Sequence, residues 1–252
     1  MDQQQQNAPE MRAITISRQY GSGGGEVAAR LAQRLGWQLI DHEIVAQVAH
    51  ALGITEAEAE VHDERVEGFI ARLLNALQAA ALVVPTPMIP PEQVERVYND
   101  ALGRVVETAA NAGRVVIVGR AGQVLLAKRR DVLHVRMVAP LKQRIDYVAR
   151  REGLDEAAAQ ARVQLKDRNR VRYLQAQFGC NVNDPLLYDL VVNTSVLDLD
   201  SVVVLICVAL EHKARKLTVR TGELGPVIGL ERYPGQPEDL RPPASLTGDE
   251  SA

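Results

Sequence analysis

Residues 13–36, AITISRQYGSGGGEVAARLAQRLG, contain the pattern that decides the fold of this chain of 252 residues. A short run rich in β-branched residues, Ala13 to Ser17, predicts a buried strand. A glycine-rich stretch, Gly21 to Gly25, follows it and predicts a loop. From Glu26 the apolar residues recur every four positions, as on one face of a helix, until Gly36 ends the pattern. The segment therefore predicts a strand, a loop and a helix in succession.

The rest of the chain continues this alternation of strands and helices. Continuous apolar runs between helical segments are typical of a parallel sheet covered on both faces. The segment after the last run, 200–216, has strand propensity in VVVLICV, but its position calls for a closing helix that Asp198 or Asp200 is placed to cap. Further strands are predicted at 37–41, 115–118, 132–137 and 190–193, and helices at 123–128 and, with a break at Gly153, at 141–172.

Composition along the chain predicts one folded domain between two tails. The polar residues 1–11 and the Pro-, Gly- and acid-rich residues 222–252 lack periodicity and are predicted to be disordered. A single α/β domain is expected over 12–221. Within it, 43–110 is predicted as a helical insertion, interrupted by the prolines of 84–91.

Charge and composition argue against several kinds of partner. The 29 basic and 32 acidic residues give a formal net charge of −3, which provides no overall field for a nucleic acid polymer or an acidic membrane. The longest apolar run, Val202 to Leu210, is far shorter than the roughly 20 residues that cross a bilayer. The start MDQQQQNAPE lacks the pattern of a secretory signal, and two cysteines fit a reducing compartment, so a cytoplasmic location is expected. The five histidines show no metal-binding spacing, and no protein metal site is predicted.

The glycine-rich loop is the main candidate site. Glycines between a strand and a helix leave backbone N–H groups free to converge on an anion, and the helix N-terminus adds about half a positive charge. A kinase-type phosphate loop reads G-x-x-x-x-G-K-[ST], with a lysine for the outer phosphates and a hydroxyl for Mg²⁺. Here Gly24 falls at the lysine position, and Gly25 with Glu26 falls at the hydroxyl position. The loop is therefore predicted to bind phosphates without two of the usual side chains.

Two other interpretations of the glycines stay open at this point. Gly23-x-Gly25-x-x-Ala28 fits the dinucleotide fingerprint G-x-G-x-x-A, and Asp41 ends the next predicted strand, which would suit a dinucleotide-dependent oxidoreductase. Against this, a long helical insertion precedes the third strand. The glycines could also serve only to turn the chain.

Four blocks of the sequence resemble the cytidylate kinase-like family. They are ITISRQYGSGGGEVAARLAQRLGW…LIDHEI, VVIVGRAG, LKDRNRVRY and YDLVVNTS, and they occur in the family's order between about 12 and 216. The resemblance implies a P-loop kinase-like three-layer fold of the nucleoside monophosphate kinase branch, with a five-stranded parallel sheet. It also implies that 43–110 closes over the acceptor nucleotide and that a basic helical lid, 153–176, closes over ATP.

The resemblance also implies roles for individual residues. Family members read S-R-x-[YF]-G-S-G-G at the loop, so the missing lysine is a family trait, although many relatives carry a basic residue where this chain has Gly25. Arg18 is the candidate replacement for the missing cation. Arg120 is expected to contact the acceptor's phosphate, and Asp41 either orients the acceptor, holds Mg²⁺ through water or caps the following helix. Cytidylate kinases commonly have an acid two residues before this arginine, where this chain has Val118.

The predicted lid carries cations on two sides of one helix. Residues 166 and 170 form one i, i+4 pair, residues 168 and 172 form another, and the two pairs point to nearly opposite sides. Arginines that close over a transferring phosphoryl group would neutralise its charge. A solvent-exposed basic face is the alternative interpretation.

Together these features predict an ATP-dependent phosphotransferase that uses Mg²⁺ and acts on a small acceptor, with a nucleoside monophosphate such as CMP as the expected substrate. The alternative is a catalytically impaired, kinase-like nucleotide-binding or regulatory protein. Helices predicted between Phe69 and Val84 would pack on the sheet or on a second copy, which leaves a homodimer open. The predicted site residues are Arg18, Arg168, Arg170 and Arg172 for catalysis; Gly21, Ser22, Gly23, Gly24, Gly25 and Lys166 for ATP; and Asp41 and Arg120 for the acceptor.

Overall fold

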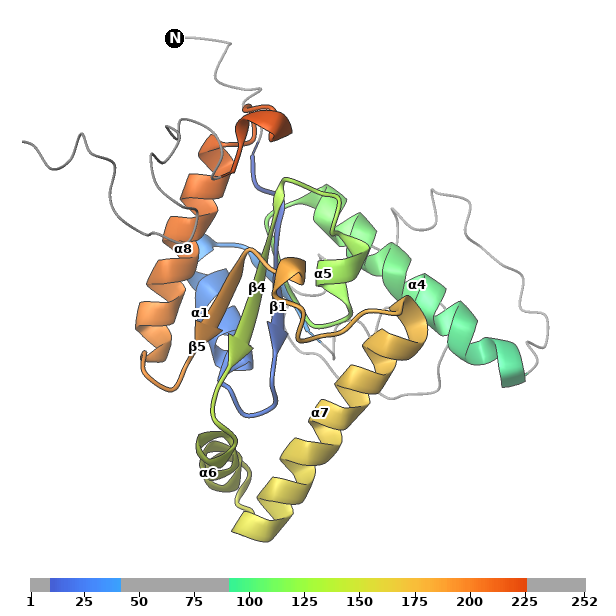
Figure 1. Ribbon diagram of the computed structural model, residues 1–252, viewed down its shortest axis with the longest axis vertical. Helices are drawn as coiled ribbons and strands as arrows, with labels where there is room; N and C mark the ends of the chain where they lie inside the picture. Colours follow the sequence, from blue (N-terminus) through green and yellow to red (C-terminus); the bar gives the residue numbers. More distant parts are fainter. Residues whose placement is uncertain (1–9, 42–90, 226–252) are drawn as a thin grey trace, which may run out of the picture.

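The computed structural model describes residues 10–41 and 91–225. Five strands form one parallel sheet in the order β2-β3-β1-β4-β5, as Figure 1 shows in part. The predicted α/β fold with a five-stranded parallel sheet is confirmed. The strands are β1 (Ala13–Arg18), β2 (Gln38–Ile40), β3 (Val115–Val118), β4 (Val132–Val138) and β5 (Leu190–Asn193).

The strand order rejects the dinucleotide interpretation of the glycine loop. In a dinucleotide-binding fold the second strand lies directly beside the first, in the order 3-2-1-4-5-6. Here β3 lies between β1 and β2, with Ala13 and Gln38 both paired to Val115. The order is therefore that of a different nucleotide-binding architecture.

Helices cover both faces of the sheet, as predicted (Figure 1). Helices α1 (Gly24–Leu35) and α8 (Leu199–Arg215) pack on one face, where they bury β-strand residues such as Ile14 and Val135. Helices α4 (Pro91–Ala112) and α5 (Gly122–Leu125) pack on the other. Because the inner strands are buried on both faces, their sequences are mostly apolar, with polar side chains such as Ser17 and Arg136 near their carboxyl ends.

Two further helices lie beyond the carboxyl ends of the strands, at the bottom of Figure 1. They are α6 (Leu141–Glu152) and α7 (Glu156–Phe178), and Gly153, with φ 65°, ends α6. This break and the helix over the VVVLICV segment both agree with the sequence-based expectation. Asp198, rather than Asp200, caps α8 by accepting a hydrogen bond from the Ser201 N–H at 2.9 Å.

Parts of the predicted domain plan lie outside the described residues. Residues 42–90 hold most of the predicted insertion, and 226–252 hold most of the predicted C-terminal tail. Met11, which falls in the predicted N-terminal tail, is buried in the core beneath α1 and α8. Two short 3₁₀ turns complete the described chain. The turn η2 (Pro185–Leu187) precedes β5, and η3 (Thr221–Glu223) follows α8. None of the helices in the described part of the chain is both long and apolar enough to span a membrane.

Candidate active site

A cavity of about 600 Å³ lies between the carboxyl ends of the strands and helix α7. In open parallel α/β sheets this end of the strands is where ligands bind. The described lining contains one carboxylate, Asp167, against a larger number of cations. The site therefore favours a polyanionic ligand. The cationic side chains are Arg18, Arg120, Arg136, Lys166 and Arg170.

The glycine loop connects β1 to α1 beside this cavity. Gln19 and Tyr20 line the cavity, whereas Gly21 to Gly25 lie outside its lining. Gly21 and Gly23 have φ angles of 80° and 75°, in the left-handed region that favours glycine. A Cβ atom on Gly21 would lie 2.7 Å from the Arg144 carbonyl oxygen, and one on Gly23 would lie 2.8 Å from a methyl group of Leu199. Gly23 caps α1 without a side-chain hydrogen bond, so the first amides of the helix meet no capping side chain. The loop has the backbone geometry of an anion site.

The next two glycines differ sharply in their surroundings. A Cβ atom on Gly24 would lie 2.8 Å from the Cβ atom of Arg18, whereas one on Gly25 would have nothing within 4 Å. The lysine position of the usual motif therefore has no room for a side chain, and the position after it does. The Ser22 hydroxyl is buried and donates to the Gln19 carbonyl oxygen at 2.8 Å, and the Ser22 N–H donates to the same oxygen at 3.3 Å. Both donors of Ser22 are thus used within the loop.

Arg18 leads from the end of β1 toward the end of β3. Its guanidinium occupies the space that a Cβ atom on Gly119 would need. Burial, together with the charges of Arg170 and Arg120, lowers the pKa of Arg18 to about 9, while the charge of Asp41 opposes that shift. The guanidinium is therefore still charged at neutral pH, in a cluster where like charges outweigh the carboxylates.

The turn after β3 holds Arg120 in an unusual backbone conformation. Gly119, Arg120 and Ala121 have consecutive φ angles of 75°, 56° and 53°. Left-handed conformations cost free energy for residues other than glycine and concentrate at functional sites. The Arg120 Nη2 atom is buried, and no described group accepts a hydrogen bond from it. Arg120 also lines the cationic cavity, and a buried guanidinium nitrogen without a partner fits an anionic ligand there.

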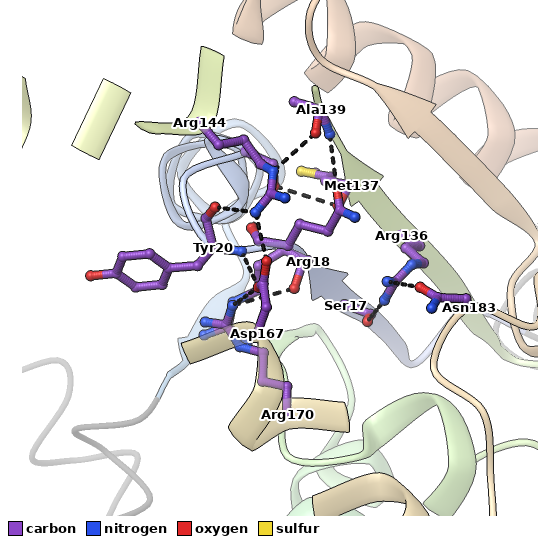
Figure 2. Close-up of polar contacts among 12 residues, drawn as sticks. Ser17, Arg18, Tyr20, Arg136, Met137, Ala139, Arg144, Asp167, Arg170 and Asn183 are labelled. Carbon is purple, nitrogen blue, oxygen red and sulfur yellow. Dashed lines mark hydrogen bonds and ion pairs between the residues drawn. The ribbon is translucent and has the colours of Figure 1, made fainter. Parts of the chain in front are cut away.

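Helix α7 is joined to the loop through Asp167 (Figure 2). One Asp167 oxygen accepts from the Tyr20 N–H at 2.8 Å, and the other pairs with the Arg144 guanidinium at 2.6 Å. Arg144 also donates to the Tyr20 carbonyl oxygen at 3.0 Å, so Asp167 and Arg144 bind the two peptide groups on either side of Tyr20. Arg170 lies over the Tyr20 ring at 5.4 Å and donates to the Arg18 carbonyl oxygen at 3.5 Å. These contacts place α7 directly against the candidate phosphate loop.

The two sides of α7 differ, as the i, i+4 geometry predicts. Lys166 and Arg170 line the cavity. Arg168 and Arg172 are exposed and lie outside the cavity lining. Their catalytic role stays a prediction, and it would require the helix to move. Arg170, by contrast, already contacts Arg18 and Tyr20.

Asp41 ends the described part of the β2 segment. Its charge acts on Arg18, which brings an acid into the arginine cluster. The helix that it was predicted to cap would begin beyond Asp41, outside the described residues. No group of three or more metal-binding side chains occurs among the residues that the structure describes.

Sequence reasoning missed the buried Arg136 and the clamp formed by Asp167 and Arg144. Arg136 lies in a strand that is apolar apart from His134, and a charged residue in such a strand was the available signal. Asp189 lies directly before β5. Its carboxylate accepts from the His134 N–H at 2.8 Å and from the Lys213 ammonium at 2.5 Å, which anchors that strand.

Comparisons with known proteins agree with this geometry. A cytidylate kinase from Pyrococcus furiosus is 30% identical over 205 residues, which cover 79% of this chain and 88% of that protein. A uronate isomerase from Corynebacterium glutamicum is 33% identical over 112 residues, 44% of this chain and only 21% of that protein. In several such pairings the chain spans about half of the relative's length or less.

One solved structure shows a similar fold. It is an uncharacterized protein from Eubacterium ventriosum, 21% identical, with a TM-score of 0.58, and the match covers 81% of this chain and 99% of that one. A sequence model described as the cytidylate kinase-like family matches residues 13–196, which is most of the chain and includes the loop, Arg120 and Asp167. The strand order, the glycine loop and this match agree that the chain belongs to the cytidylate kinase-like family.

Proposed function

We propose that this protein transfers the γ-phosphoryl group of ATP to a small acceptor, and that the acceptor is a nucleoside monophosphate such as CMP. The observation that carries the proposal is the unpaired Arg120 Nη2 atom within a cluster that includes Arg18 and Arg170. Like charges brought together in this way raise the free energy of the empty site, and two phosphorylated ligands would offset that cost.

The loop beside the cavity and the cations that line it each have a role in this proposal. The amides of Gly21, Gly23, Gly24 and Gly25 at the start of α1 bind the phosphates of ATP. Arg120 binds the phosphate of the acceptor, because a planar guanidinium matches its oxygens. Arg18 and Arg170 lie between these groups and neutralise the charge that spreads over the phosphoryl group during transfer.

Arg18 takes the part of the missing lysine. Arg18 is the last residue of β1, directly before the loop. Its Cβ atom leaves no room for a side chain at position 24. A charge-assisted hydrogen bond contributes about 1.5 to 3 kcal/mol, so a cation here is worth roughly tenfold to a hundredfold in rate. Asp41 orients the acceptor or keeps Arg18 charged through its proximity.

Mg²⁺ fits the site only as an ion brought by the nucleotide. The described residues lack a cluster of three metal-binding side chains, and the usual hydroxyl position holds Gly25 and Glu26, whose carboxylate pairs with Arg151. Mg²⁺ commonly keeps several waters and takes only one or two carboxylates besides phosphates. Asp41 is the residue that would meet it through water, and the ion would supply charge neutralisation at the ATP phosphates.

A specific observation also favours the second candidate, a nucleotide-binding protein with impaired catalysis. The open space at Gly25 lacks the basic side chain that many relatives carry, and no described cation fills it within 4 Å of a Cβ atom at that position. In that case ATP binds and the acceptor is not turned over.

Phosphate transfer is tested by following ADP formation from ATP and Mg²⁺ with AMP, CMP, GMP, UMP and their deoxy forms. We expect turnover with at least one of them, and a fall of about a hundredfold in kcat/KM for that acceptor in Arg120→Met. Arg215→Gln is the control, because the Arg215 side chain is 68% exposed on α8. Binding of ATP without turnover of any acceptor would refute the proposal and favour the second candidate.

A further inference from the structure

The Arg136 side chain is a cation in the cavity lining that the proposed transfer does not use. Arg136 lies in β4 opposite Ser17 of β1, and only 5% of it is exposed. It lines the same cavity as Arg120 and Arg170. A buried arginine is expected to have a partner, because an uncompensated charge in a protein interior is costly.

The partners that hold Arg136 are all neutral. Its Nη1 group donates to the Ser17 hydroxyl at 3.1 Å and to the Tyr188 hydroxyl at 3.3 Å, and its Nη2 group donates to the Asn183 side-chain oxygen at 2.9 Å. Figure 2 shows Ser17 and Asn183 at the two ends of this guanidinium. The group also lies 5.4 Å from the centre of the Tyr188 ring. No ion pair within the described residues involves Arg136, so its orientation is fixed while its charge stays unneutralised.

Two donors of this guanidinium remain for a ligand. Arginine has five N–H groups, and the three bonds above use two on Nη1 and one on Nη2. The Nε–H and the second Nη2–H have no acceptor among the described residues. The structure thus holds two N–H donors in one plane at the wall of the cavity, with no compensating carboxylate.

We propose that Arg136 is the residue that selects the base of the acceptor, an inference that rests on the proposed function. Arginine recognises a base edge that carries two adjacent acceptors, as it does with O6 and N7 of guanine. Cytosine presents O2 and N3 as two adjacent acceptors, whereas uracil has an N–H donor at N3. Arg136 therefore favours CMP over UMP, because the uracil N3–H would face its N–H donors.

The test is the affinity of the full chain for CMP, UMP and ATP, measured by isothermal titration calorimetry. The variants are Arg136→Gln and Arg136→Lys, and Arg215→Gln on the exposed face of α8 is the matched control. We expect the unaltered chain to bind CMP more tightly than UMP. In Arg136→Gln the affinity for CMP should fall by about tenfold to a hundredfold, while the affinities for UMP and ATP change by less than about threefold.

Other results would overturn the inference. Unchanged CMP affinity in Arg136→Gln refutes it, and so does an equal loss of affinity for CMP, UMP and ATP, which indicates a structural role. If circular dichroism shows that Arg136→Gln does not fold, Arg136→Lys carries the test, since it keeps a positive charge in the same space and should still lose the preference for CMP. CMP turnover with unaltered selectivity in the variants refutes this inference alone. Failure of the unaltered chain to bind or phosphorylate any nucleoside monophosphate refutes the proposed function and this inference together.

Discussion

The glycine loop and helix α7 lie against each other, and they would bind an anion by opposite means. The loop offers backbone geometry, with Gly21 and Gly23 in left-handed conformations and no charged side chain between Gly21 and Gly25. Helix α7 offers side-chain charge, from Lys166 and Arg170. The positive charge that the loop lacks is thus supplied by elements packed against it. Whether that charge reaches an anion at the loop depends on the contacts that hold the two regions together.

The largest effect is expected where those two regions are joined. Asp167→Asn removes the charge that pairs with Arg144, whose side chain is only 8% exposed. Breaking such a pair leaves an uncompensated buried charge, and we expect a loss of about 2 to 3 kcal/mol in the free energy of unfolding, measured with urea. The control is Asp200→Asn, whose partner Arg30 is 45% exposed and whose loss should cost less than about 0.5 kcal/mol. Equal effects would mean that the clamp on Tyr20 contributes little to the fold.

The next largest effect should separate the two sides of α7. Arg170→Met removes a cation that reaches the Arg18 backbone, so we expect kcat/KM for phosphate transfer to fall by about a hundredfold. Arg168→Met changes an exposed side chain outside the cavity lining and should cost at least about tenfold less. Steady-state kinetics with the same acceptor compares the two. Equal losses would show that α7 turns or closes during the reaction, so that both sides meet the substrates.

Two alanine substitutions test whether positions 24 and 25 differ in the space they offer a side chain. Gly24→Ala brings a Cβ atom to 2.8 Å from the Arg18 Cβ atom, and we expect it to lower the free energy of unfolding by about 1 to 2 kcal/mol. Gly25→Ala places its Cβ atom in open space on a helix and should raise that free energy by about 0.5 kcal/mol. Thermal and urea unfolding measure both. The opposite order of effects would contradict the account of why the lysine position is empty.

The smallest effect is expected at a hydrogen bond between Tyr20 and the end of helix α6. The Tyr20 hydroxyl donates to a Glu152 carboxylate oxygen at 2.6 Å, and this bond, with the nearby Arg162, lowers the pKa of Glu152 below its ordinary value of 4.5. A lowered folded-state pKa stabilises the fold above the unfolded-state pKa, and the contribution is lost as the pH falls toward the folded-state pKa.

We therefore expect Tyr20→Phe to be less stable than the unaltered chain by under about 1 kcal/mol at pH 7, with the difference shrinking below about pH 4.5. Urea unfolding at several pH values gives the comparison. A difference that stays constant down to pH 3 would show that Glu152 does not carry the effect.

The fold could be predicted because it depends on local patterns. The apolar runs and the four-residue spacing after Glu26 report burial directly, and Gly36 and Gly153 ended helices as their backbone freedom allows. The division of α7 into two sides also follows from helix geometry alone, since residues four apart share a side.

The rest of the candidate site depends on which distant segments meet. Arg136 bonds to Ser17, 119 positions earlier, only because β4 pairs with β1 in one register. The Asp167 contact with Tyr20 spans 147 positions and requires α7 to lie on the loop. A pattern within a window of twenty residues carries no information on either contact, and so Asp167 was read as a member of a basic segment rather than as its anchor.

The central position of β1 in the sheet delays its pairing while the protein is synthesised on the ribosome. The strand that holds Arg18 is made first, yet Ala13 must pair with Val115 and Val132, which leave the ribosome about a hundred residues later. At about 5 to 20 residues per second, this buried strand and the glycine loop wait for several seconds without neighbouring strands. A chain interrupted before β4 leaves one edge of β1 open to aggregation.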